Sequence, residues 1–447
     1  MDGNGGRVMD EIIHDLGEKS RFLRILWCDN GNMIRSKALR TNDTEISEAT
    51  VGISRAQQGV PVVYDGVAPD APLDPVGEVY LKADISTIRK LPYATGNSLA
   101  IGDMFVDGSP WEYCPRNYLK RMINLVWEEG LEIKAAFENE FYLLNRQEPL
   151  KCTENTAFAS TNSMNLNNDV IMEIVEDLEA QDLIVEQYYA ESGPCQHEIT
   201  LHYDDALNAA DNQILFRETV RGVASKHDRV ASFLPKLFYD HAGSGCHIHI
   251  SLWKDGVNIL HDADEIFELS QTAHHFIAGI LEHQSSLMAI TTPTPNSYRR
   301  ILPSSWVGKY GCWGFDNREA SIRVVRESDG KIKHFEFKTS DATSNPYLSL
   351  GSIICSGVHG IHEKLRLPDP VQLDPALLEE EERSKRNIKD LPSSLDHALN
   401  SLSCDEVILN SLGDGLSKAY IAVKTEENRY LKEFCLGKEV NLLLDKY

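Results

Sequence analysis

The sequence predicts an α+β protein with two domains, a small sheet-rich N-terminal domain and a larger domain of strands and helices. A chain of 447 residues is long enough to form two cores. Between residues 60 and 106, short apolar runs such as 62–64, 79–81 and 99–101 alternate with Pro, Gly and Asp, as expected for short strands. Residues 107–110 are turn-rich. We therefore expect domains at residues 1–107 and 108–447.

The elements follow from local patterns. Residues 22–27 are rich in β-branched and aromatic side chains and precede Asn30-Gly31, which predicts a hairpin over residues 21–39. Helical spacing of apolar residues begins at Pro115 and stops at Gly130. Further strands are expected at 133–143, 184–189, 197–202, 230–237, 247–252, 320–325 and 332–338, and further helices at 169–181, 205–226, 265–290 and 345–365. Residues 291–314, rich in Pro, Ser and Gly, are expected to be a long loop.

Composition excludes several classes of function. The 44 Lys and Arg against 68 Asp and Glu give a net charge of −24, which argues against a nucleic-acid or anionic-membrane surface. The acidic excess is compatible with carboxylates around divalent cations, although surface solubility explains it equally well. The nine cysteines form no C-x-x-C pair, no apolar run reaches about 18 residues, and no signal-peptide pattern is present. We expect a cytoplasmic protein with reduced thiols.

A glycine-hinged stretch, residues 240–252, runs into a strand with one polar face. Because strand side chains alternate, His247, His249 and Ser251 share a face while the intervening aliphatic residues take the other. Such a face either is exposed to solvent or lines a site. Gly243 and Gly245 allow close approach of the backbone.

The same two-residue spacing recurs in other strands. It places Glu138 with Glu140 and His334 with Glu336 and Lys338, while Glu191 and Glu198 flank a Gly-Pro kink. Any one of these carboxylates could be a surface strand position, but repetition on three strands favours a shared site. Clustered carboxylates need compensating charge. Carboxylates with one imidazole suit Mg²⁺ or Mn²⁺ better than zinc, which usually takes more nitrogen or sulfur ligands.

Six ordered motifs resemble the glutamine synthetase family, in particular its bacterial-type (type I) branch and the relatives that ligate other amines to glutamate. The motifs are FENEF (137–141), ESGPCQHE (191–198), GSGCHIH (243–249), NSYRR (296–300), NREASIR (317–323) and NPYL (345–348). The resemblance implies a small N-terminal β-grasp domain and a larger catalytic domain, whose antiparallel strands form a funnel flanked by helices. It also implies a ring-shaped homo-oligomer in which neighbouring subunits share sites.

The resemblance implies roles for individual residues. One metal would be held by Glu140, Glu191 and Glu198, and a second by Glu138, His247 and Glu336. ATP would contact His249, Ser251, Tyr203, Glu186 and Lys331. Arg318 and Arg323 would hold the transferring phosphate, and Arg300, Gly243 and Lys338 would bind glutamate. Cofactors would thus be ATP with Mg²⁺ or Mn²⁺.

Departures from the family pattern concentrate at the amine and substrate positions. Trp306 stands where ammonia-using members carry a glutamate that closes the site and binds ammonium. A Trp there could wall a larger amine or make a cation–π contact. Lys338 replaces a substrate-binding arginine and lacks its bidentate fork.

The leading hypothesis is therefore an ATP-dependent ligase that joins ammonia or, preferably, a larger amine to the γ-carboxyl of glutamate through γ-glutamyl phosphate. The alternative is a glutamine-synthetase-like oligomeric protein with a regulatory or structural role and little ligase activity. A kinase of a guanidino or carboxyl substrate is a third, weaker hypothesis, because it would not need the Arg300 and Asn317-Arg318 elements.

Overall fold

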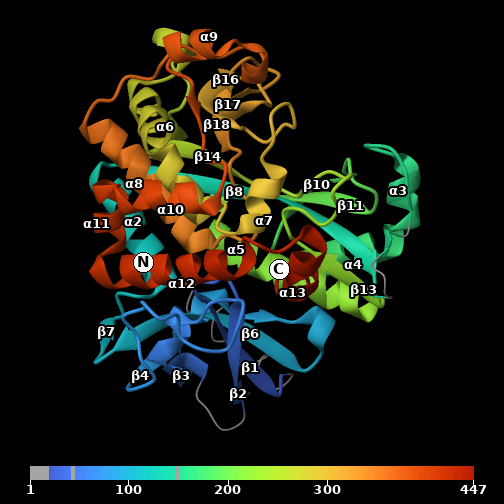
Figure 1. Cartoon of the computed structure of the whole chain (residues 1–447). Coiled ribbons are helices and arrows are strands. Elements are labelled where there is room, and N and C mark those ends of the chain that lie inside the picture. The colour runs from blue at the N-terminus through green and yellow to red at the C-terminus, as the bar shows by residue number, and fades with distance from the viewer. Residues whose placement is uncertain (1–19, 42–45, 147–150, 153) are drawn as a thin grey trace.

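The computed structural model describes residues 20–41, 46–146, 151–152 and 154–447. It contains a small N-terminal sheet and a larger body in which helices cover a long sheet (Figure 1). The mixed helix and sheet architecture and the small N-terminal sheet domain expected from the sequence are confirmed. The exact division at residue 107 stays a prediction.

The N-terminal sheet has the strand order β2-β1-β6-β4-β3, with β5 and β7 also paired to β6. Its strands are β1 (Phe22–Cys28), β2 (Ile34–Arg40), β3 (Thr50–Ser54), β4 (Glu78–Ala83), β5 (Arg89–Lys90), β6 (Asn97–Val106) and β7 (Ser109–Pro110). The hairpin prediction is confirmed by the antiparallel β1–β2 pair, while β1 and β6 run parallel. The prediction that residues 62–64 form a strand is wrong. They form a turn, and Val62 and Val63 pack instead against C-terminal residues such as Leu431 and Val440.

The large sheet has the order β10-β11-β8-β14-β18-β17-β16-β19, with β9, β12 and β13 paired to β8 and β15 paired to β14. Its strands are β8 (Glu132–Asn145), β9 (Lys151–Cys152), β10 (Val185–Ala190), β11 (Gln196–Leu201), β12 (Asp204–Asp205), β13 (Arg229–Ser232), β14 (Cys246–Lys254), β15 (Val257–Asn258), β16 (Tyr310–Phe315), β17 (Ala320–Arg326), β18 (Ile332–Phe337) and β19 (Lys389–Asp390). The expected antiparallel arrangement holds except between β16 and β17, which run parallel.

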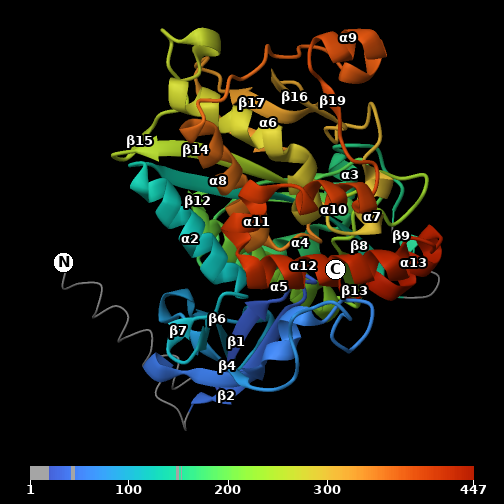
Figure 2. The same ribbon diagram turned by 60° about the vertical axis from the view of Figure 1, so that its left-hand side comes forward.

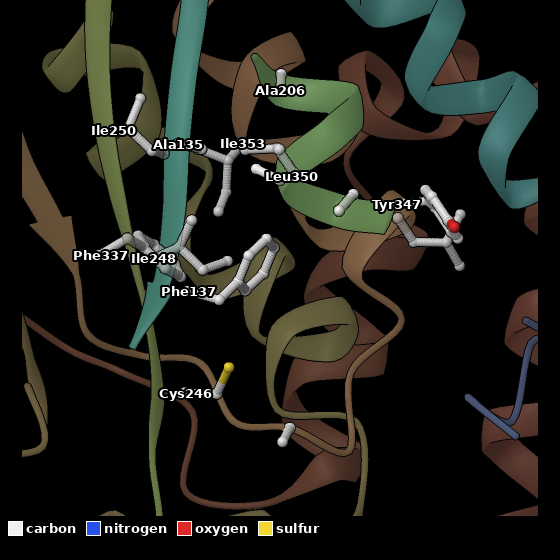
Figure 3. Close-up of a cluster of buried hydrophobic side chains, with 14 of the residues drawn as sticks. Ala135, Phe137, Ala206, Cys246, Ile248, Ile250, Phe337, Tyr347, Leu350 and Ile353 are labelled. Atoms are coloured by element: carbon white, nitrogen blue, oxygen red, sulfur yellow. The ribbon is translucent and has the colours of Figure 1, made fainter. Parts of the chain in front are cut away.

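The described residues also form helices on and around this sheet. They are α2 (Pro115–Glu128), α3 (Thr161–Leu166), α4 (Asn168–Glu179), α5 (Ala206–Lys226), α6 (Gln271–Thr291), α7 (Pro295–Arg300), α8 (Pro346–His362), α9 (Glu380–Lys385), α10 (Leu395–Ser403), α11 (Glu406–Leu412), α12 (Asp414–Leu431) and α13 (Leu436–Leu443). Phe137 of β8 and Ile248 of β14 pack with Leu350 of α8 in one buried cluster (Figure 3). Among the described helices, none is both long and apolar enough to cross a bilayer.

The predicted loop at residues 291–314 is in part regular structure, since it contains α7 and β16. The start of α7 explains the error. Thr294 and Ser297 form a capping box and Pro295 occupies the first helical position, so the Pro and Ser that were taken as loop composition are helix-start residues. The helix expected from residue 265 begins only at Gln271, and residues 230–237 pair as a strand only within β13.

The tip of the β1–β2 hairpin is bonded to the large body. Asn32 Nδ2 donates to the Ala342 carbonyl over 2.9 Å, and Asn345 Nδ2 donates to the Asp29 carbonyl over 3.1 Å. In both views α12 runs between the small sheet and the large sheet (Figures 1 and 2), and its Glu427 accepts a 2.8 Å bond from the Val62 amide. The small sheet is thus held directly against the segment that follows β18.

Arg116 connects the two parts through three carboxylates. Its buried guanidinium contacts Asp211 of α5 at 2.7 Å, Asp103 of β6 at 2.9 Å and Asp84, after β4, at 2.9 Å. Arg116→Ala leaves Asp211 buried without its cation, so we expect the free energy of unfolding to fall by about 3–5 kcal/mol. Urea denaturation measures the change.

The matched control is Lys418→Ala, which removes an exposed ion pair with Asp414 within α12. Its expected loss is below about 0.5 kcal/mol. Equal losses for the two variants would contradict a structural role for the buried Arg116 cluster.

Candidate active site

The register of β8 with its two neighbours brings the polar faces of three strands together. Across the β8–β14 pair Glu138 lies opposite His247, and across the β8–β11 pair Glu140 lies opposite Glu198. His247 Nδ1 is 2.8 Å from Glu138 Oε1, and His249 Nε2 is 3.0 Å from Glu138 Oε2. The two-residue spacing in the sequence therefore corresponds to one shared face.

Glu336 joins this face from β18. Glu336 is buried and lies opposite both His249 and Arg323 in the sheet. Its carboxylate accepts hydrogen bonds from Lys338 Nζ over 2.9 Å and from Arg323 Nη1 over 3.2 Å. Burial opposes its ionisation, but the Lys338 ammonium and the hydrogen bond from His247 hold the pKa of Glu336 well below its ordinary value. Glu336 is thus an anion inside the protein.

Two groups of side chains on this face have the geometry of metal ligands. Glu138, Glu140 and His247 form one group, and Glu138, His249 and Glu336 form the other, with the ligand atoms of each within 4.8 Å of one another. Glu138 belongs to both. Burial would raise the pKa of Glu138, but hydrogen bonds from His247 and His249 keep it below its ordinary value.

This grouping differs from the one implied by the resemblance, which paired Glu140 with Glu191 and Glu198. Glu191 is half-buried in the bend between β10 and β11, and neither it nor Glu198 falls within the two groups found among the described residues. Burial and the charges of Glu138 and Glu140 raise the pKa of the Glu198 carboxyl to about 10. The predicted division of ligands between two metals stays a prediction.

The donor set fits a divalent cation on two observations. His247 Nε2 is buried and has no hydrogen-bond partner among the described residues. A Cβ at Gly245 would lie 2.7 Å from this nitrogen and 3.1 Å from Glu140 Oε1, so both atoms border the space that glycine leaves free. An unpaired imidazole nitrogen beside carboxylate oxygens suits Mg²⁺ or Mn²⁺.

Two supporting residues were missed by the sequence analysis. Gln196 Nε2 donates to Glu140 Oε2 at 3.2 Å and to the Gly243 carbonyl at 3.0 Å, and Tyr189 donates to Glu198 Oε2 at 2.8 Å. Alternation along β11 offered a sign for Gln196, which lies two residues before Glu198. The sequence offered no sign for Tyr189, because its contact depends on how β10 pairs with β11.

A cavity of about 560 Å³ opens beside the carboxylates and is large enough for a small-molecule ligand. Four of the five predicted nucleotide residues line it, namely Glu186, Tyr203, His249 and Ser251. Lys331 is exposed and lies outside this lining, which includes Lys333.

The aromatic wall of this cavity contains a residue that was not predicted. Trp253 lies with its ring centroid 6.1 Å from that of Tyr203, and Lys134 Nζ lies 4.7 Å above the Trp253 ring. A flat ring can stack on such a surface.

Arg300 presents a buried, incompletely paired guanidinium. Its Nη2 donates to the Ser340 carbonyl at 2.9 Å, but its Nε has no partner among the described residues. A Cβ at Gly243 would lie 2.5 Å from Arg300 Cγ, so only glycine leaves room for the Arg300 side chain beside this loop. A buried guanidinium with an unpaired Nε–H is suited to a carboxylate.

The remaining predicted residues lie on loops. Arg318 is exposed between β16 and β17. Trp306 is 55 % exposed after α7, has a φ of +60°, and donates its backbone N–H to Glu319 Oε1 at 3.0 Å.

Gly245→Ala tests the cation site. The added methyl would collide with His247 Nε2 and crowd Glu140, so we expect the dissociation constant for Mn²⁺ to rise by about 10- to 100-fold. Electron paramagnetic resonance of free Mn²⁺ measures the binding.

Gly437→Ala in α13 is the matched control, because a Cβ there meets nothing within 4 Å. It should bind Mn²⁺ as the parent does. An unchanged affinity for Mn²⁺ in Gly245→Ala would contradict a cation site beside His247 and Glu140.

Comparisons with known proteins agree with this geometry. Residues 112–441 match the family model for the glutamine synthetase catalytic domain. The chain is 34 % identical to type-1 glutamine synthetase 1 of Dictyostelium discoideum, covering 96 % of this chain and 90 % of the relative, and 33 % identical to the glutamine synthetase of Pyrococcus abyssi, covering 97 % and 95 %. A crystal structure of a novel glutamine synthase homolog superimposes with a TM-score of 0.84 at 26 % identity, covering 96 % of this chain and 99 % of that one. A complex of GmaS with ADP superimposes with a TM-score of 0.82 at 25 % identity, covering 98 % of this chain and 99 % of that one. With matched motifs, matched fold and this degree of identity along nearly its whole length, the chain belongs to the glutamine synthetase family.

Proposed function

We propose that this protein is an ATP-dependent ligase that joins an amine larger than ammonia to the γ-carboxyl of glutamate. The proposal depends on the two carboxylate–histidine groups that share Glu138 and lie next to the 560 Å³ cavity. The cavity would hold ATP, and the site face would meet its phosphates. The similarity to a structure solved with ADP supports this placement.

The chemistry follows in two steps. An oxygen of the glutamate γ-carboxylate attacks the γ-phosphorus of ATP, and the bond from that phosphorus to the ADP oxygen breaks to give γ-glutamyl phosphate. The amine nitrogen then attacks the γ-carbonyl carbon, the carbon–oxygen bond to phosphate breaks, and the amine loses a proton. Divalent cations bound at the carboxylates would neutralise phosphate charge during the first step.

The described side chains supply positioning and charge. Arg300 offers an unpaired, buried Nε–H to the α-carboxylate of glutamate. Arg323, whose guanidinium contacts Glu336, and the exposed Arg318 are proposed to hold the transferring phosphate. Lys338 is buried and forms an ion pair with Glu336, so we propose that it keeps the Glu336 carboxylate ionised. We also propose that its ammonium contacts the substrate, as a point charge rather than a bidentate fork.

Trp306 supports the preference for an organic amine. It stands at the position where the family's ammonia-using members carry a glutamate, and an indole cannot bind ammonium as a carboxylate does. The non-catalytic alternative is not favoured, because the metal-ligand types are all retained.

We also propose that the chain belongs to the type I branch and forms a cytoplasmic, ring-shaped homo-oligomer whose neighbouring subunits complete each site. The similarity to a type-1 relative supports the branch. By the family resemblance, the small domain of one subunit would complete the site of its neighbour.

Phosphate release from ATP with Mg²⁺ tests the ligase. We expect release to depend on glutamate and to be faster with one organic amine than with ammonia, in a panel of hydroxylamine, alkylamines and diamines. A maximum with ammonia would mean that Trp306 is no obstacle and that this is an ordinary glutamine synthetase. No glutamate-dependent release, with ATP bound, would favour the non-catalytic alternative.

Two variants control this assay. Glu336→Gln should lower release by at least about 100-fold, since bound metal contributes several kcal/mol to the transition state. Glu132→Gln, at the exposed start of the same sheet's β8, should leave release unchanged. Near-parental turnover in Glu336→Gln would contradict the metal assignment.

Shared sites make a further prediction. Monomers separated by size exclusion under dissociating conditions should release no phosphate, and activity should return on reassembly. Full activity in a verified monomer would contradict a site completed by a neighbour.

A further inference from the structure

Three aromatic side chains form a row beside the carboxylates. Phe158 lies edge-on to Tyr189, with ring centroids 6.1 Å apart and planes at 87°, and edge-on to Trp306, at 6.4 Å and 83°. We call these three residues the aromatic row. They come from a loop before α3, from β10 and from the loop after α7, so the fold brings together segments that are distant in the sequence.

The row is apolar and open to solvent. Phe158 is 49 % exposed and Trp306 is 55 % exposed, although both are large side chains that usually bury much of their surface. Phe158 has no polar atom to satisfy. Two neighbouring exposed rings form an apolar surface that a ligand can cover.

One end of the row is joined to the acidic face. The Tyr189 hydroxyl donates to Glu198 Oε2 at 2.8 Å. A ligand lying on the row therefore has the Tyr189 hydroxyl and the Glu198 carboxyl at one end and hydrocarbon along its length.

The other end is fixed by the backbone. Trp306 has a φ of +60°, which a bulky residue rarely adopts, and its N–H donates to Glu319 Oε1 at 3.0 Å. Glu319 thus acts as a positioning residue that holds the Trp306 loop against Phe158. Strained backbone held by a specific contact is typical of binding sites.

We propose that the aromatic row is the acceptor subsite and that the acceptor is a primary amine with an apolar body, of the arylalkyl or long alkyl class. This inference rests on the proposed ligase function and names its substrate class. The amine nitrogen of the acceptor would lie toward Tyr189 and Glu198, and its apolar body would cover Phe158 and Trp306. Phe158 is thereby a specificity-determining residue.

The arrangement disfavours the competing acceptors. Ammonia has no body to cover the rings and gains nothing from them. A diamine would place its second ammonium against Phe158, where the cost of lost hydration exceeds the cation–π attraction of about 0.5–1 kcal/mol that an exposed ring offers. A monoamine of the same length loses only contact with water, which favours binding.

The test compares kcat/KM for phenylethylamine, pentylamine and pentane-1,5-diamine, with hydroxylamine as a small acceptor that reports γ-glutamyl phosphate. We expect pentylamine to exceed the diamine by about tenfold or more, and phenylethylamine to be at least as good. In Phe158→Ala, the ratio of kcat/KM for phenylethylamine to that for hydroxylamine should fall by about 10- to 100-fold, through a higher KM for phenylethylamine.

Phe158→Leu provides a second variant that keeps an apolar side chain, and it should give a smaller fall in the same ratio. Trp127→Ala removes an exposed Trp at the end of α2, far from the row in sequence, and should leave the ratio unchanged. These controls separate the loss of the row from a general effect on folding.

The outcomes distinguish the inference from the proposed function. Hydroxamate formation together with equal use of pentylamine and the diamine, or an unchanged ratio in Phe158→Ala, would overturn the acceptor subsite and leave the ligase standing. No glutamate-dependent phosphate release with any acceptor, hydroxylamine included, would overturn both.

Discussion

The pairing of β8 with β14 on one side and with β11 on the other is the constraint on which the site depends. Each pairing places a carboxylate of β8 opposite a polar residue of its neighbour, Glu138 opposite His247 and Glu140 opposite Glu198. A slip of one residue in either register would turn these side chains toward the apolar core and the core aliphatics toward the site. The packing of Phe137 and Ile248 under α5 and α8 therefore fixes the acidic face as firmly as any contact within it.

That coupling explains why so much of the site follows from sequence. Alternation along a strand is a local property, so Glu138 with Glu140, and His247 with His249, were recognisable as pairs that share a face. Family resemblance then supplied which strands meet. Residues whose role depends on the pairing of two strands or on a loop conformation were not recognisable, since nothing local distinguishes Tyr189 from another strand tyrosine or Phe158 from a buried one.

The errors in the predicted fold also arise because the partners of a segment cannot be seen from its local sequence. Residues 62–64 have the composition of a strand but are used as a turn, because α12 and the C-terminal residues provide their apolar partners and Glu427 their hydrogen bond. Thr294, Pro295 and Ser297 have the composition of a loop but start a helix, because together they satisfy its first amides. In both cases the secondary structure is determined by the partners of these residues and not by their composition alone.

The two halves of the site differ in what supports them. The cation face is built on central strands, each bonded on both sides, whereas Phe158 and Trp306 stand on connections outside every sheet. Substitutions in the connections need not disturb the strands, while substitutions in the strands affect the core. On the proposed assignment, a descendant of this protein would change its acceptor by altering two loops, while the strands that carry the cation face are inherited intact.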